Sequence, residues 1–121
     1  MQDVPAIIKK LKNETVVESI IQFGSSLERK DYRDIDLCIF TIKPLNMKEK
    51  LILLRNIPEK YDISFYEELP LHIKREVLTK GKVLFTKNYY RILQQVQYVE
   101  LEYPRYKDFL EDYHREVAAA L

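Results

Sequence analysis

The sequence predicts an α/β domain in which a small β-sheet is flanked by helices and followed by a helical tail. Apolar residues alternate between the spacing of amphipathic helices and the spacing of strands up to about residue 87. Beyond that point only helical spacing remains. Alternating segments of this kind are typical of α/β proteins. At 121 residues the chain is long enough for one hydrophobic core and one domain.

The N-terminal half predicts one helix and two strands. Residues 3–12 carry apolar side chains at helical spacing, with Pro5 in the first turn. Residues 15–23 are rich in β-branched residues and are expected to form a strand. Residues 26–33 are polar and predict a short helix or loop. Residues 35–40 are almost continuously apolar, as in a strand that is covered on both faces.

The following segments continue the alternation. Residues 45–56 predict a second helix, which Pro58 closes. Residues 61–66 alternate between apolar and polar and predict a half-buried strand. A third helix is expected over residues 70–80, ending at a glycine, and a last short strand over residues 83–86.

The C-terminal part from Tyr89 has helical spacing throughout, and Pro104 is expected to interrupt it. Six of the nine tyrosines lie here: Tyr89, Tyr90, Tyr98, Tyr103, Tyr106 and Tyr113. Packing of the tail on the sheet is the favoured explanation, and a partner-binding or dimer surface is the alternative. Residues 118–121 (AAAL) look like an expression-vector remnant, so the natural tail is expected to span residues 88–117.

Composition argues against some classes of function and indicates the cellular compartment. A net charge of +1 gives no strong attraction to nucleic acid or to anionic membranes. The single cysteine, Cys38, cannot form an internal disulfide, which fits a reducing cytoplasm. No apolar run approaches the roughly 20 residues of a membrane span, and the N-terminus lacks a signal-peptide core. A cytoplasmic protein is therefore expected.

Three aspartates form the candidate catalytic centre. Asp34 and Asp36 are two apart on a predicted strand, so their carboxylates leave the same face. Two neighbouring carboxylates repel each other unless a cation lies between them, and oxygen ligands at this spacing suit Mg²⁺ or Mn²⁺. Asp62, which opens the next predicted strand, is the best candidate for a third carboxylate and for a proton acceptor.

A glycine and a serine provide a candidate phosphate seat. Gly24 follows a predicted strand and precedes an expected helix start, where the backbone can approach a phosphate closely. Backbone N–H groups and the Ser25 hydroxyl would donate hydrogen bonds there. A pair of metal ions beside such a seat is the arrangement for in-line displacement at phosphorus.

These residues carry a resemblance to a known family. The stretch FGSSLERKDYRDIDLCIF is similar to the Gly-Ser … Asp-x-Asp signature of the DNA polymerase β-like nucleotidyltransferases. The stretch YDISFYEELPLHIKREVLTKGKVLF resembles their minimal nucleotidyltransferase (MNT) branch. The resemblance covers roughly residues 15–87. It implies a nucleotidyltransferase fold with a mixed sheet, and a core at residues 1–87 extended by the helical tail.

The resemblance also implies an activity. MNT proteins are often antitoxins that transfer AMP from ATP to a tyrosine of a HEPN ribonuclease. For this chain it implies two Mg²⁺ ions held by the three aspartates, ATP as substrate, and a HEPN-type partner encoded nearby. The nucleotide would be held by these residues: Gly24, Ser25, Ser26 and Arg29. The family commonly has an arginine where this chain has Ser26, so Arg29, Lys30 or Arg33 would have to supply the positive charge.

Two other functions stay open at this point. A binding module could neutralise a HEPN-type partner through complex formation alone, which the altered Gly-Ser segment favours. Transfer to a small-molecule acceptor is disfavoured because the chain has no sizeable second domain to enclose it. The sequence does not determine the acceptor, the nucleotide base or the oligomeric state, and self-association stays open.

Overall fold

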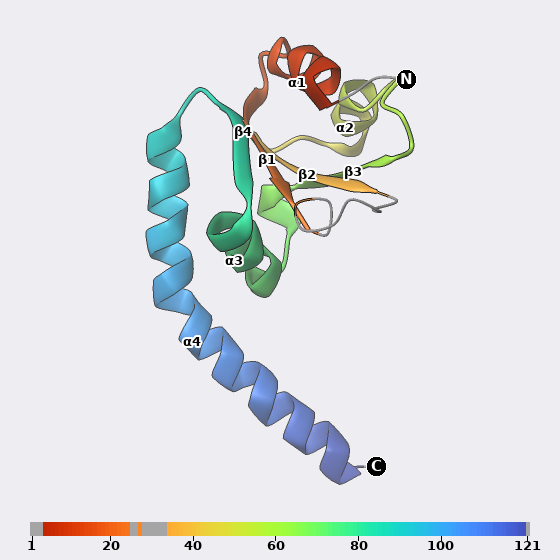
Figure 1. Cartoon of the computed structure of the whole chain (residues 1–121). Helices are drawn as coiled ribbons and strands as arrows, with labels where there is room; N and C mark the ends of the chain where they lie inside the picture. The colour runs from red at the N-terminus through yellow and green to blue at the C-terminus, as the bar shows by residue number, and fades with distance from the viewer. Residues whose placement is uncertain (1–3, 25–26, 28–33, 121) are drawn as a thin grey trace.

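The computed structural model describes residues 4–24, 27 and 34–120, and it contains a four-stranded sheet with helices on both faces (Figure 1). The strands are β1 (Val17–Phe23), β2 (Ile35–Thr41), β3 (Tyr61–Phe65) and β4 (Lys82–Thr86). Their order in the sheet is β3-β2-β1-β4. β1 is antiparallel to β2 and β4, whereas β2 and β3 are parallel. The predicted mixed sheet is confirmed.

Two helices cover one face of the sheet. These are α1 (Val4–Lys12) and α2 (Met47–Leu53), which lie together above the sheet in Figure 1. Their buried side chains join the core cluster that contains Ile35, Leu37 and Ile39 of β2. Alternate residues of a strand point to opposite faces, so these odd-numbered side chains define the α1–α2 face.

The other face is covered by α3 (Leu71–Lys80) and by the start of α4 (Tyr89–Ala120). Cys38 and Phe40 of β2 point to this side and join a second core cluster with Tyr66 and Val77. Phe40 and Tyr66 stack with their ring centroids 4.2 Å apart. Asp36 has the same parity as Cys38 and therefore faces α3 as well.

Local sequence explains where the shorter helices begin and end. α2 begins after Asn46, whose side chain accepts a hydrogen bond from the Glu49 backbone N–H, while the Glu49 side chain accepts one from Asn46. This capping box starts the helix two residues later than expected. α3 ends at Gly81, as predicted, although Gly81 has a negative φ of −73°. Glycine is needed there because a Cβ would lie 2.2 Å from the Val77 carbonyl oxygen.

The tail differs from the prediction in two ways. α4 is one continuous helix of 32 residues that contains Pro104, so the expected interruption is wrong. Proline removes one backbone hydrogen bond and bends a helix, and the rest of the ladder can continue. Figure 1 shows α4 changing direction partway along and then projecting away from the sheet. Packing of the whole tail on the sheet is therefore wrong for the distal half, whereas the first half packs against α3.

No helix in the described part of the chain combines the length and the apolar character needed to cross a membrane.

Candidate active site

The parallel pairing of β2 and β3 brings two of the predicted aspartates together. Asp36 of β2 is in register with Asp62 of β3, and the Asp62 carboxyl group lies within hydrogen-bonding reach of the Asp36 carboxyl group. Asp36 points to the α3 side of the sheet with Cys38, and Asp62 does the same because it is the register partner of Asp36 in this parallel pair. This contact could not be read from sequence separation, since the two residues lie 26 positions apart.

The electrostatics of Asp36 are those of a carboxylate beside other carboxylates. Partial burial, followed by the charge and hydrogen bond of Asp62, raises its pKa from 3.8 to about 6. Asp34, which is exposed at the residue before β2, raises this pKa further, and so does Glu76 of α3. The ionised form of Asp36 is therefore disfavoured at this position in the absence of a cation.

Gly24 closes the site from the end of β1. Its φ is +80°, a left-handed conformation that favours glycine. A Cβ at this position would lie only 2.4 Å from Oδ2 of Asp36. The glycine backbone therefore approaches the carboxylate pair more closely than any other residue type would allow. Ser25, Ser26 and Arg29, the other predicted nucleotide-binding residues, lie outside the described residues.

The carboxylates fit a divalent cation that is shared with a substrate. Within the residues that the structure describes, no three His, Cys, Asp or Glu side chains form a ready-made metal cage. Mg²⁺, however, usually takes only one or two protein carboxylates and completes its shell with phosphate oxygens and water. The contact between Asp36 and Asp62 supplies that number, and the raised pKa of Asp36 shows that positive charge would be favourable there.

Sequence reasoning missed two side chains on the same side of the sheet. The negative charge of Glu76 in α3 adds to the rise in the pKa of Asp36, and no sequence motif identifies Glu76. Lys74, two residues before Glu76, lies with Nζ 5.1 Å from the centroid of the Tyr66 ring. Burial raises the pKa of Cys38, and the positive charge of Lys74 partly offsets this rise; Cys38 lies two positions along β2 from Asp36. The only sequence signal for them is their spacing from Val77, the buried residue of α3.

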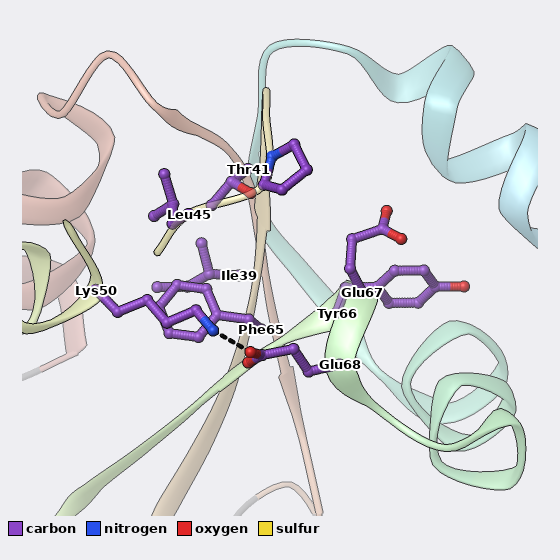
Figure 2. Close-up of a pocket in the computed structure, with 9 residues that line it drawn as sticks. Ile39, Thr41, Leu45, Lys50, Phe65, Tyr66, Glu67 and Glu68 are labelled. Atoms are coloured by element: carbon purple, nitrogen blue, oxygen red, sulfur yellow. Dashed lines mark hydrogen bonds and ion pairs between the residues drawn. The ribbon is translucent and has the colours of Figure 1, made fainter. Parts of the chain in front are cut away.

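A second hollow lies at the opposite end of β2 and β3, and Figure 2 shows its lining. Ile39, Leu45 and Phe65 point into one side, whereas the ring of Tyr66 points away towards α3. The hollow measures about 100 Å³, and its Lys50 forms an ion pair with a glutamate at the rim. Since this charge is already paired and the space is small, the carboxylate pair is the stronger candidate for chemistry.

A carboxylate pair beside a glycine turn, on a mixed sheet with this strand order, is the arrangement of a nucleotidyltransferase. A family model described as "Polymerase beta, Nucleotidyltransferase" matches residues 6–90, and the chain belongs to this family. A relative from Methanocaldococcus jannaschii, named as a protein adenylyltransferase, is 35% identical over 71 residues. That match covers 57% of this chain and 56% of the relative, so the similarity spans little more than half of either protein.

Solved structures confirm the fold. A chain of a mutant toxin–antitoxin MntA complex superimposes with a TM-score of 0.79 at 17% identity, covering 98% of this chain and 99% of that one. A toxin–antitoxin structure with AMP-PNP gives a TM-score of 0.74 at 18% identity and 93% and 95% coverage. A complex of a tri-AMPylated HEPN toxin with an MNT antitoxin from Shewanella oneidensis gives 0.69 at 19% identity, with 94% of both chains covered.

Proposed function

We propose that this protein is a Mg²⁺-dependent adenylyltransferase that moves AMP from ATP to a tyrosine hydroxyl of a HEPN-type partner protein, and thereby acts as its antitoxin. The observation that carries the proposal is the contact between Asp36 and Asp62 beside Gly24. Membership of the nucleotidyltransferase family supports the reaction class. The AMP-PNP and AMPylated HEPN toxin named for the similar structures support the nucleotide and the partner.

The carboxylates have separate roles in this proposal. Asp34, Asp36 and Asp62 would hold the two cations together with the triphosphate oxygens. When bound, the cations supply charge stabilisation at the reacting phosphorus and at the leaving group. Asp62 is the more exposed member of the contacting pair, so it is the one that can meet an acceptor arriving from solution.

The reaction is an in-line displacement. The acceptor oxygen forms a bond to the α-phosphorus of ATP, and the bond from that phosphorus to the bridging oxygen of the β-phosphate breaks. The acceptor proton passes to the Asp62 carboxylate, and pyrophosphate leaves with the bridging oxygen. Gly24 carries no Cβ, so the Asp36 carboxylate can lie against the end of β1, and the backbone turn at this glycine is proposed to receive the triphosphate beside it. Ser25, Ser26 and Arg29 are proposed to bind the same phosphates.

The proposal is tested by incubating the purified protein with Mg²⁺, ATP labelled at the α-phosphate and the HEPN-type protein encoded beside it. Wild-type protein is expected to transfer label to a tyrosine of the partner. Asp36→Asn and Asp62→Asn are each expected to reduce the rate at least about 100-fold, because the cation site loses a charged ligand. Asp108→Asn, the same change at an exposed position of α4, serves as the matched control.

Two results would count against the proposal. Full transfer by folded Asp36→Asn protein would remove the carboxylates from the mechanism. A stable complex that never takes up label would favour the alternative, in which the protein neutralises its partner by binding alone. Label on an added small molecule, with none on the partner, would favour the remaining alternative, transfer of AMP to a small-molecule acceptor.

A further inference from the structure

The projecting half of α4 carries an apolar stripe that continues an internal helix contact. Five residues repeat at alternating spacings of three and four: Tyr103, Tyr106, Leu110, Tyr113 and Val117. The first two contact α3. The Tyr103 ring lies under the Arg75 guanidinium group at 4.5 Å, and the Tyr106 hydroxyl lies 3.1 Å from Nδ1 of His72. The stripe therefore extends past the point where α3 can cover it.

The distal stripe is exposed in the described chain. Phe109, which borders it, is 64% exposed, Tyr113 is 55% exposed and Val117 is 42% exposed. An isolated helix of this length is marginal in water, and apolar side chains gathered on one face stabilise it only when another surface covers them. A large exposed apolar patch of this kind marks an interaction site.

A groove of about 480 Å³ adjoins the stripe between α3 and α4. Leu71 and Lys74 of α3 line one wall. The other wall belongs to α4 and carries three aromatic residues and two charged ones: Tyr98, Tyr106, Phe109, Glu102 and Arg105. Tyr106 and Phe109 thus belong both to the groove and to the border of the stripe. Aromatic side chains beside an open groove are the usual anchors for a partner helix.

The groove is connected to the catalytic face through Lys74. The same Lys74 side chain reaches the Tyr66 ring and acts on Cys38, which neighbours Asp36 on β2. A protein bound in the groove would therefore be held on the side of the sheet where the carboxylates lie. This is the side from which an acceptor hydroxyl has to approach.

The charges on the distal helix indicate the chemistry of the occupant. Asp112 and Glu116 lie beside the exposed apolar residues of the stripe, whereas Asp108, Glu111 and Arg115 lie on the opposite face of the helix. An occupant with an apolar ridge and positive charges beside it would complement this distal part of the surface.

We propose that the α3–α4 groove and the distal apolar stripe of α4 form one docking surface for a helix of the acceptor protein, a helix with an apolar face and basic margins. This inference rests on the proposed function, because it takes the acceptor to be a protein. The docking surface holds the acceptor while its tyrosine reaches the carboxylates, and it binds whether or not nucleotide is present.

The test uses full-length protein with a triple substitution in the docking surface, Phe109→Ser with Tyr113→Ser and Val117→Ser. The matched control replaces three residues on the opposite face of the same helix segment: Asp108→Ser with Glu111→Ser and Arg115→Ser. Tyr113→Arg is a second, single variant that keeps the helix otherwise intact and adds a charge of the same sign as the expected margins. Circular dichroism checks that all three are folded.

Affinity for the neighbouring HEPN-type protein is measured by calorimetry without nucleotide, in an Asp36→Asn background. The triple variant and Tyr113→Arg are each expected to bind at least about 10-fold more weakly, and the opposite-face control within about twofold of the parent. Equal affinity of parent and triple variant would overturn the inference, and so would a complete lack of binding by the parent.

Separate measurements distinguish this inference from the proposed function. If wild-type protein binds the partner through the docking surface but transfers no AMP, the docking inference stands and the proposed function fails. If transfer proceeds equally in wild type and triple variant, the proposed function stands and the docking inference fails. Light scattering that shows a dimer lost only in the triple variant, with partner affinity unchanged, would assign the surface to a second copy and overturn the inference.

Discussion

Relieving the repulsion between Asp36 and Asp62 is expected to stabilise the metal-free protein while removing its activity. Asp36 has a pKa of about 6 in the folded protein, against 3.8 for an unperturbed carboxyl group. Between these two values the folded protein binds more protons than the unfolded chain. Stability therefore falls as the pH rises through this window, and the loss is complete above about pH 7.

The size of the effect follows from the shift. A difference of this size corresponds to about 3 kcal/mol at a fully buried site. Asp36 is only partly buried and solvent screens its neighbours, so a loss of about 1 kcal/mol is the better expectation. Asp36→Asn removes the charge and should recover about that amount at pH 7.5, which is a rise in melting temperature of roughly 3–5 °C. At pH 4 the wild-type side chain is already largely protonated, so the two proteins should be nearly equal.

The assay is thermal and urea unfolding of both proteins at pH 4 and pH 7.5, with and without millimolar Mg²⁺. Mg²⁺ should stabilise wild-type protein at pH 7.5 and have a much smaller effect on Asp36→Asn, because binding to the folded state raises stability by mass action. Asp108→Asn should show no such pattern. An Asp36→Asn protein that is less stable than wild type at pH 7.5, or equally affected at both pH values, would refute the like-charge argument.

Three further predictions concern the surroundings of the site. Gly24→Ala should lower the free energy of unfolding by about 1–3 kcal/mol in urea titrations, because the new Cβ would meet Oδ2 of Asp36 at a positive φ; unchanged stability would contradict the clash. Arg91→Ala should lower the free energy of unfolding by about 2–3 kcal/mol, because Arg91 donates to the Thr41 carbonyl at 2.6 Å and to the nearly buried Glu18 at 3.1 Å. Adding Glu18→Gln to this variant should restore part of the lost stability. Cys38 has a pKa raised to about 12 by burial, so it should react with a thiol reagent only after unfolding, and rapid labelling of the native protein would show that this face opens.

Part of the site's geometry was predictable because it depends on local spacing. The Asp-x-Asp pattern places two carboxylates on one strand face, and Gly24 marks the turn before them. Asp62 was expected to join Asp36 because it opens the next predicted strand, but the contact itself depends on the parallel register of β2 and β3. Register depends on long-range pairing, which periodicity within a single strand does not specify.

The tail shows why helical periodicity alone could not place α4. Its apolar stripe has the same spacing on both sides of Pro104, so the sequence pattern is identical for the covered half and for the exposed half. What separates them is the length of α3, which ends after ten residues and cannot reach the distal residues of α4. The proline was expected to interrupt the helix, yet α4 continues through Pro104 because the backbone hydrogen bonds resume on either side of it.

The two places where this chain departs from ordinary packing rules are the two places to which a function is assigned. Asp36 and Asp62 lie in contact although both are acidic, and the distal face of α4 leaves Phe109 and Tyr113 in water. The first departure costs stability in the isolated protein, whereas the second leaves apolar surface unburied; a cation would relieve the first and an apolar partner surface would cover the second. Because Lys74 contacts the Tyr66 ring on the carboxylate side of the sheet and also lines the groove, we expect binding of nucleotide and cation to be coupled to binding of the acceptor. That coupling predicts that Mg²⁺ and ATP tighten partner binding in wild-type protein but leave it unchanged in Asp36→Asn.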